Sequence, residues 1–128
     1  MDLILWRHAD AEDGDESIED MNRVLTPRGV KQAARVAGWL DRQLPEGTRV
    51  LSSPARRCEQ TAMALGRKYK VRPELGPEAS SDQLLEAAQW PHSKHAVLIV
   101  GHQPTLGETI ARILPVEHPA GPVRKGMA

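Results

Sequence analysis

Several features that would assign a protein to a compartment or to a macromolecular partner are missing from this sequence. Its 128 residues include one cysteine, Cys58, so an intrachain disulfide is excluded and a reducing compartment is expected. Lys plus Arg and Asp plus Glu each number 17, and this balance argues against a general electrostatic attraction to nucleic acid or to an acidic membrane. No apolar run approaches the length of a membrane span, and the first residues lack the basic start and long apolar stretch of a secretory signal. These absences predict a cytoplasmic protein that binds neither nucleic acid nor a membrane.

Signatures of cofactor and metal sites are missing as well. There is no glycine-rich loop of the nucleotide-binding kind, and no set of His, Cys and carboxylate residues has convincing zinc spacing. His92 and His95 lie in a polar loop and His118 lies in a Pro-rich tail, where a solvated histidine is the simpler interpretation. Cys58 falls on the apolar side of a predicted helix, which favours a buried, inert thiol over a nucleophile. We therefore expect neither a metal nor a cofactor.

The apolar pattern predicts a single domain over residues 1–128, in which strands and helices alternate. In chain order it predicts strand 3–6, helix 26–44, strand 50–51, helix 53–69, edge strand 71–75, helix 80–90, strand 96–100 and helix 105–114. Such alternation is typical of an α/β protein with three α/β/α layers and a mainly parallel sheet. Residues 10–22 are acidic and poor in apolar residues, which indicates a solvated loop, and residues 115–128 are rich in Pro and Gly, which indicates an irregular tail.

Local signals predict where the helices begin. Thr26-Pro27 and Ser53-Pro54 each combine an N-cap residue with a proline suited to the first helical position. Two further pairs have the spacing of a capping box, namely Ser80 with Gln83 and Thr105 with Glu108. Helical spacing predicts an apolar face on the first helix that consists of Val30, Ala33, Ala34, Ala37, Leu40 and Leu44.

Polar side chains follow three of the predicted strands at the point where each strand ends. The first strand is followed by Arg7 and His8, the second by Arg56 and Arg57, and the last by His102. The carboxyl ends of parallel strands meet at one edge of a sheet, and ligands bind beyond that edge. These side chains are therefore expected to converge from distant parts of the chain.

This set of side chains suits phosphoryl transfer. The guanidinium fork of arginine matches phosphate oxygens and keeps its charge, and neutral imidazole is a competent nucleophile near neutral pH. Nearby guanidinium charges disfavour protonation of His8, which keeps its lone pair available. Each feature alone has a plainer interpretation: Arg7 and His8 as a surface pair, His102 as a residue that bonds a carbonyl, and Arg56 with Arg57 as a solvated helix face. The combination of three strand ends favours the functional interpretation.

Four segments together resemble the motifs of the histidine phosphatase superfamily, which has the phosphoglycerate mutase-like fold. These segments are 3–9, 25–33, 52–62 and 100–104. Segment 52–62 is similar to the second motif of that family, in which the phosphate-binding arginine stands four residues before a threonine, and this selects Arg57 over Arg56. The short length and the sequence Glu59-Gln60-Thr61 resemble the SixA-type phosphohistidine phosphatases within the superfamily.

The resemblance implies a metal-independent phosphatase in which His8 accepts the phosphoryl group while Arg7, Arg57 and His102 hold its oxygens. It implies a phosphohistidine-bearing signalling or phosphotransfer protein as the substrate, and a monomer is expected. This sequence departs from the family pattern at Ala9, where glycine is usual. It also lacks the mid-chain insertion that carries a general acid in the larger relatives.

The missing acid bears on the substrate. Expelling an alkoxide benefits from a proton donor, whereas a phosphohistidine has a good leaving group once its ring nitrogen is protonated. Asp10, Glu74 and Glu78 are candidate donors, each more simply a solvated carboxylate. Two other functions stay open: a phosphatase for a small phosphomonoester, and a module that binds phosphohistidine without turnover.

Overall fold

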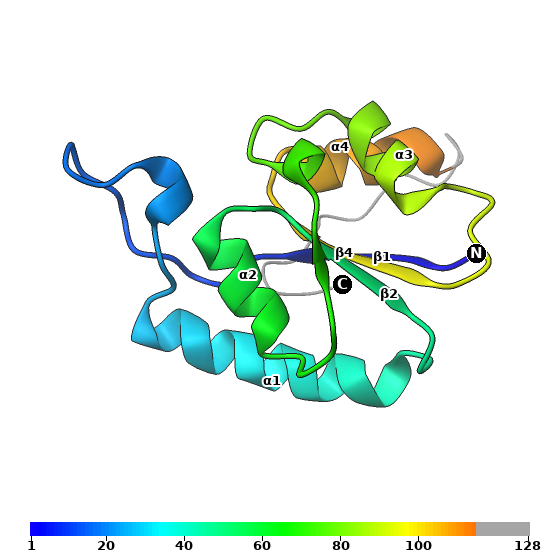
Figure 1. Cartoon of the computed structure of the whole chain (residues 1–128), viewed down its shortest axis with the longest axis horizontal. Coiled ribbons are helices and arrows are strands. Elements are labelled where there is room, and N and C mark those ends of the chain that lie inside the picture. The colour runs from blue at the N-terminus through cyan, green and yellow to red at the C-terminus, as the bar shows by residue number, and fades with distance from the viewer. Residues whose placement is uncertain (115–128) are drawn as a thin grey trace.

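A parallel sheet forms the centre of the computed structural model, which describes residues 1–114 (Figure 1). The strands lie in the order β1-β4-β2-β3, and each neighbouring pair is parallel. Their bounds are β1 Leu3–Arg7, β2 Arg49–Ser52, β3 Lys70–Val71 and β4 Val97–Gly101. All five residues of β4 are buried, as expected for a central parallel strand that is covered on both faces. The predicted strands 3–6, 50–51 and 96–100 are confirmed.

Helices cover both faces of this sheet. Helices α1 and α2 lie on one face, and α3 and α4 lie on the other (Figure 1). Their bounds are α1 Pro27–Gln43, α2 Arg56–Met63, α3 Ser81–Ala88 and α4 Thr105–Ile113. The predicted three-layer α/β/α architecture with a mainly parallel sheet is therefore confirmed.

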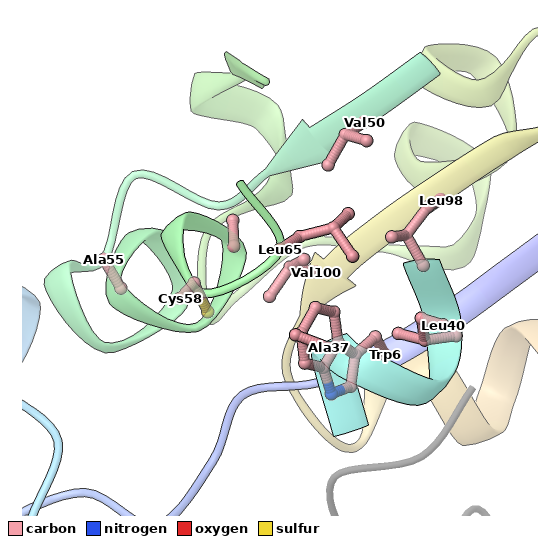
Figure 2. Packing of buried hydrophobic residues seen from close by; sticks show 10 residues of the cluster. Trp6, Ala37, Leu40, Val50, Ala55, Cys58, Leu65, Leu98 and Val100 are labelled. Atoms are coloured by element: carbon pink, nitrogen blue, oxygen red, sulfur yellow. The ribbon is translucent and has the colours of Figure 1, made fainter. Parts of the chain in front are cut away.

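The core beneath the carboxyl end of the sheet is built from alternate residues of the central strands. Leu98 and Val100 of β4 share one hydrophobic cluster with Trp6 of β1, on the side of α1 and α2 (Figure 2). Val97 and Ile99 belong to the opposite cluster, under α3 and α4. Because successive side chains of a strand point to opposite faces, both faces are anchored at once. The strand ends that follow this core are thus held rigidly.

The orientation of α1 differs from its predicted apolar face. The buried residues are Gly29, Ala33, Ala37 and Leu40, whereas Val30 and Ala34 are exposed, so the face is rotated from the one predicted. The helix begins as predicted, because the Thr26 hydroxyl accepts a hydrogen bond from the Gly29 amide at 2.9 Å.

A close backbone contact explains this rotation. A Cβ added at Gly29 would lie 2.0 Å from the carbonyl oxygen of Asp10. Glycine is therefore required where α1 packs on the segment that follows His8. This contact turns Gly29 inward and Val30 outward. The spacing of the apolar residues in α1 does not predict the contact.

Helix α2 begins later and ends earlier than predicted. The Ser53 amide donates to the Val100 carbonyl at 3.0 Å and so prolongs the β2 ladder, which leaves Ala55 rather than Ser53 as the N-cap. Gly66 follows the helix in the left-handed region at φ 74°, so Tyr69 lies beyond the helix. The interpretation of Ser53 as a helix cap is thus wrong.

Two other local predictions are corrected, and one is confirmed. The edge strand expected at 71–75 is limited to β3, and Pro73 begins the short 3-10 turn η2 (Pro73–Leu75). The capping box expected at α4 does not form in the part of the chain that the structure describes. Thr105 is the first residue of this helix, and its hydroxyl donates to the Ala79 carbonyl at 2.8 Å. The capping box of Ser80 and Gln83 is present at α3, which ends at Ala88.

No helix within residues 1–114 is long and apolar enough to cross a membrane. The predicted irregular tail 115–128, together with His118, lies outside the described residues.

Candidate active site

Three chain segments emerge side by side at the carboxyl edge of the sheet. Arg7 is in register with Gly101, and Ser52 is in register with Val100. The His8 amide then donates to the Gly101 carbonyl at 3.1 Å, which extends the ladder by one residue. His8 and Ser53 thus donate the last of these backbone hydrogen bonds to β4, His102 follows β4 directly, and the three side chains meet.

The two predicted histidines face each other. The ring centroids of His8 and His102 are 5.3 Å apart with an interplanar angle of 62°. Nδ1 of His8 lies 2.8 Å from the Ala9 carbonyl oxygen, which can only accept, so Nδ1 carries the ring proton. The lone pair of neutral His8 is therefore on Nε2. This is the nitrogen that can act as a nucleophile.

The environment keeps His8 neutral. Burial lowers the pKa of His8 from its ordinary value to about 4, and the charges of Arg57 and Arg7 act in the same direction, while the bond to the Ala9 carbonyl opposes them. The same guanidinium groups would attract an anion. The site thus combines a neutral nucleophile with fixed positive charge.

His102 is more deeply enclosed than His8. It is 4% exposed, and burial followed by the charge of Arg57 lowers its pKa to about 3. Its Nε2 lies 2.7 Å from the Ser53 hydroxyl, and its Nδ1 lies 3.5 Å from Nη2 of Arg57. The Nδ1 edge of the ring therefore faces the guanidinium group.

Arg57 is 4% exposed, whereas its neighbour Arg56 is exposed. Helix α2 carries Arg57 at its second residue, where the side chain turns toward the sheet edge. The Nε atoms of Arg57 and Arg7 are both buried without a hydrogen-bond partner among the described residues. The Nε–H of each guanidinium group is thus not bonded within residues 1–114.

Asp20 is a site residue that the sequence analysis missed. It belongs to the short 3-10 turn η1 (Asp20–Asn22), inside the segment predicted to be a solvated loop. Its carboxylate Oδ2 lies 3.1 Å from Nη2 of Arg57, and its carbonyl oxygen accepts from Nη1 of Arg57 at 2.8 Å. Arg23 donates to the other carboxylate oxygen at 2.9 Å. In sequence, Asp20 is one of many acidic residues in this loop, and nothing distinguishes it.

The carboxylate of Asp20 stays ionised near neutral pH. The hydrogen bond from Arg23 is the main cause that lowers the pKa of Asp20, and the hydrogen bond and charge of Arg57 add to it, while burial opposes them. An ionised carboxylate accepts hydrogen bonds and has no proton to give. Asp20 is therefore suited to hold a donor and not to serve as a general acid.

Two of the three acids singled out from the sequence have a side-chain partner. The Asp10 carboxylate accepts from the Thr26 hydroxyl at 2.8 Å, and Glu74 pairs with Arg72 at 2.6 Å. Glu74 and Glu78 line a pocket of about 490 Å³ together with Asp20. The structure thus places two of these carboxylates beside the turn that carries Asp20.

Thr61 ties the His8 segment to α2. Its hydroxyl accepts from the Ala9 amide at 3.1 Å and donates to the Arg57 carbonyl at 2.8 Å. Ala9 is fully buried, so the methyl group that replaces the glycine usual in the family is accommodated. Thr61 connects the residue after the first histidine with the residue that carries the buried guanidinium.

Cys58 is buried, as predicted, and burial raises the pKa of its thiol to about 12. Its Sγ lies 3.4 Å from Nε2 of His102 and packs against that ring. His92 and His95 are exposed, as predicted. Within residues 1–114, no group of three or more His, Cys, Asp and Glu side chains is arranged to hold a metal ion.

Comparison with known proteins gives consistent matches. A family model described as the histidine phosphatase superfamily (branch 1) matches residues 3–80. The chain is 33% identical over 128 residues to the phosphohistidine phosphatase SixA of Escherichia coli (strain K12), a match that covers 93% of this chain and 78% of that protein.

Two solved structures support the same relationship. A Nakamurella multipartitia protein assigned as phosphohistidine phosphatase SixA is 36% identical, with a TM-score of 0.74 over 85% of this chain and 63% of that chain. The protein histidine phosphatase SixA in complex with tungstate is 30% identical, with a TM-score of 0.76 over 98% of this chain and 84% of that chain. The chain thus spans less than two thirds of the length of the Nakamurella protein.

Proposed function

The chain belongs to the histidine phosphatase superfamily, and on this premise we propose that it hydrolyses phosphohistidine on a protein through a covalent intermediate on His8. The observation that carries the proposal is the state of His8. Its Nδ1 proton is held on the Ala9 carbonyl and its ring is kept neutral, so the Nε2 lone pair is available beside Arg57 and His102.

The reaction has two displacements at phosphorus. In the first, the Nε2 lone pair of His8 forms a bond to phosphorus while the bond to the leaving nitrogen breaks, and the leaving imidazole keeps the electron pair. In the second, a water oxygen forms the new P–O bond and loses a proton to solvent while the bond between phosphorus and Nε2 of His8 breaks. The electron pair returns to Nε2, and inorganic phosphate is released. Positioning and electrostatic stabilisation account for most of the rate of such transfers.

Arg7, Arg57 and His102 are the groups that we assign to the phosphoryl oxygens. Guanidinium groups match these oxygens in geometry and do not lose their charge. Both arginines influence the two histidines electrostatically, since their charges lower the pKa of each ring. The related SixA protein that was solved with tungstate shows that a tetrahedral oxyanion binds within this family. No metal is needed in this scheme.

The charge of Asp20 supports phosphohistidine over a phosphomonoester. An ester releases an alkoxide, which needs a proton donor, and the carboxylate nearest Arg57 is held ionised. The imidazole of phosphohistidine leaves as a neutral ring once its nitrogen is protonated, so the substrate can bring the proton that Asp20 does not supply. The partner would be a phosphohistidine-bearing signalling or phosphotransfer protein. The name of the Escherichia coli relative agrees with this substrate.

Two competing functions are separated by assay. A phosphatase for small esters would turn over sugar phosphates at least as well as a phosphohistidine peptide. A module that only binds phosphohistidine would bind the peptide and form no labelled intermediate. The neutral nucleophile at His8 favours an enzyme over a binding module, since binding alone does not require it.

The proposal is tested with His8→Ala. With radiolabelled phosphohistidine peptide as substrate, we expect the variant to lose at least about a thousandfold in kcat, because the nucleophile is removed. His92→Ala, at an exposed histidine, is the matched control and is expected to retain the wild-type rate. All assays are repeated with EDTA, which is expected to change nothing.

Two results would contradict this mechanism. Substantial turnover by His8→Ala would eliminate the covalent intermediate on that residue. Loss of activity in EDTA, followed by recovery with one divalent cation, would show that a metal supplies part of the charge assigned to the arginines.

A further inference from the structure

Ser53 makes the shortest polar contact to the second histidine of the site. Its hydroxyl oxygen lies 2.7 Å from Nε2 of His102, and both residues are buried. A hydrogen bond of this length in a water-poor environment constrains the ring orientation strongly. Ser53 leaves the ring only one edge, with Nδ1, to present to a ligand.

That remaining edge points to where an anion would bind. Nδ1 of His102 lies 3.5 Å from Nη2 of Arg57, and the ring of His8 is 5.3 Å away, centroid to centroid. An oxygen bound by Arg57 would therefore meet Nδ1 and not Nε2.

A hydroxyl suits this position better than a carbonyl or a carboxylate. The Ser53 oxygen accepts from the Ala55 amide at 3.2 Å and keeps a proton and a lone pair that can serve His102, beside the Cys58 thiol, whose Sγ lies 3.4 Å from the same Nε2. It can therefore accept from Nε2–H, or donate to Nε2 when the ring proton is on Nδ1. In the absence of an anion, Nδ1 faces the donor Nη2, so Nε2 carries the proton. When a phosphoryl oxygen is bound, Nδ1 must be the donor.

We propose that Ser53 is the positioning residue for His102: its hydroxyl holds Nε2, so that Nδ1 meets the phosphoryl oxygen, and it satisfies either tautomer of the ring. This inference rests on the proposed function for its kinetic consequence, but its effect on the tautomer of His102 does not depend on turnover. Ser53 acts through His102 and is not itself assigned a contact with the substrate.

The neighbouring serine provides a matched control. Ser52 is also fully buried, and its hydroxyl donates to the Ser53 carbonyl at 2.9 Å instead of to a histidine. Ser52→Ala and Ser53→Ala remove the same atoms from adjacent buried positions. A general effect of lost packing or a lost hydroxyl would be shared by the two variants.

The test combines nitrogen NMR of the His102 ring with steady-state kinetics. In wild type we expect a proton on Nε2 without ligand, and a proton on Nδ1 when inorganic phosphate is added. In Ser53→Ala the ring is no longer held with Nδ1 toward Arg57 and the phosphoryl oxygen, so we expect a mixture of tautomers in both states. We also expect a loss of about tenfold to a hundredfold in kcat/KM for the phosphohistidine peptide, chiefly in kcat. Ser52→Ala is expected to behave as wild type, and Ser53→Thr, which keeps the hydroxyl, is expected to recover the wild-type NMR pattern.

The outcomes separate this inference from the proposed function. An unchanged His102 tautomer in Ser53→Ala would overturn the positioning role. So would an equal loss of activity in Ser52→Ala and Ser53→Ala. If no variant, including wild type, hydrolyses the peptide, the proposed function fails, while a tautomer change confined to Ser53→Ala still supports the contact between Ser53 and His102.

Discussion

Because His8 and His102 are neutral in the folded protein, we expect the protein to lose stability in mild acid, and single substitutions can isolate the contribution of each ring. His8 and His102 have pKa values of about 4 and about 3 in the folded protein, against an ordinary value of 6.5. Below the ordinary value the unfolded chain therefore binds protons that the folded protein refuses, so stability falls as pH falls. For His8 the loss accumulates between its ordinary pKa of 6.5 and about 4, and for His102 it continues to about 3.

The size of this loss follows from the shifts. At about pH 5, lowering the pKa of His8 from its ordinary value to about 4 reduces the free energy of unfolding by on the order of 1 to 2 kcal/mol. The lower figure allows for screening by solvent. We expect urea unfolding to show this difference between about pH 7.5 and about pH 5 when wild type is compared with His8→Gln or His102→Gln. Each variant removes one titrating ring and keeps a side chain of similar size.

The comparison controls for other titrations. Only the difference in pH dependence between wild type and each variant counts, so contributions that they share cancel. His92→Gln, at an exposed position, should lose as much stability as wild type between the two pH values. If His8→Gln and His102→Gln lose as much stability as wild type between the two pH values, the fold does not hold the two rings neutral. Neutral His8 is then not available as the nucleophile.

Two further predictions concern the anion site and the packing behind it. Asp20→Asn is expected to bind inorganic phosphate about fivefold more tightly in calorimetric titration. The reason is that the Asp20 carboxylate competes with phosphate for Arg57, and an exposed ion pair of this kind contributes about 1 kcal/mol. Weaker binding would show instead that Asp20 orients the guanidinium group. Gly29→Ala should lower the free energy of unfolding by about 2 to 3 kcal/mol, since its Cβ would lie 2.0 Å from the Asp10 carbonyl oxygen, and thermal melts should show it. Gly38→Ala, where a Cβ meets nothing within 4 Å, should raise stability by about 0.5 to 1 kcal/mol, and equal shifts at the two glycines would refute the packing argument.

The elements that could be predicted from sequence are those specified by local chemistry. The run 97–100 is apolar at every position and forms the central strand β4. Thr26-Pro27 begins α1, and Ser80 with Gln83 begins α3, because a side chain three residues away can satisfy an open amide wherever the rest of the chain lies. The convergence of His8 and His102 also follows from a general rule on parallel strand ends, and the structure places their rings in contact.

The features that could not be predicted depend on partners far away in sequence. Ser53 has the sequence context of a helix cap, but His102, which is 49 residues away, takes its hydroxyl. Asp20 is one acidic residue among several in its loop until the fold sets it against Arg57, 37 residues away. In both cases a hydrogen bond to a buried partner distant in sequence decides the role of the side chain. Leaving a buried partner unpaired would cost more free energy than a local hydrogen bond contributes.

Strand register links these observations to the chemistry. Arg7 pairs with Gly101 and Ser52 with Val100, so the residues that follow leave the sheet at the same level. A slip of one residue in β4 would move His102 by about 3.3 Å and turn its side chain to the opposite face of the sheet, away from Ser53 and Arg57. The buried residues on both faces of β4 make such a slip costly, because Leu98 and Val100 would exchange environments with Val97 and Ile99. The hydrophobic core of this small sheet therefore determines which side chains meet beyond the carboxyl ends of β1, β2 and β4, and the proposed reaction depends on the identity of those side chains.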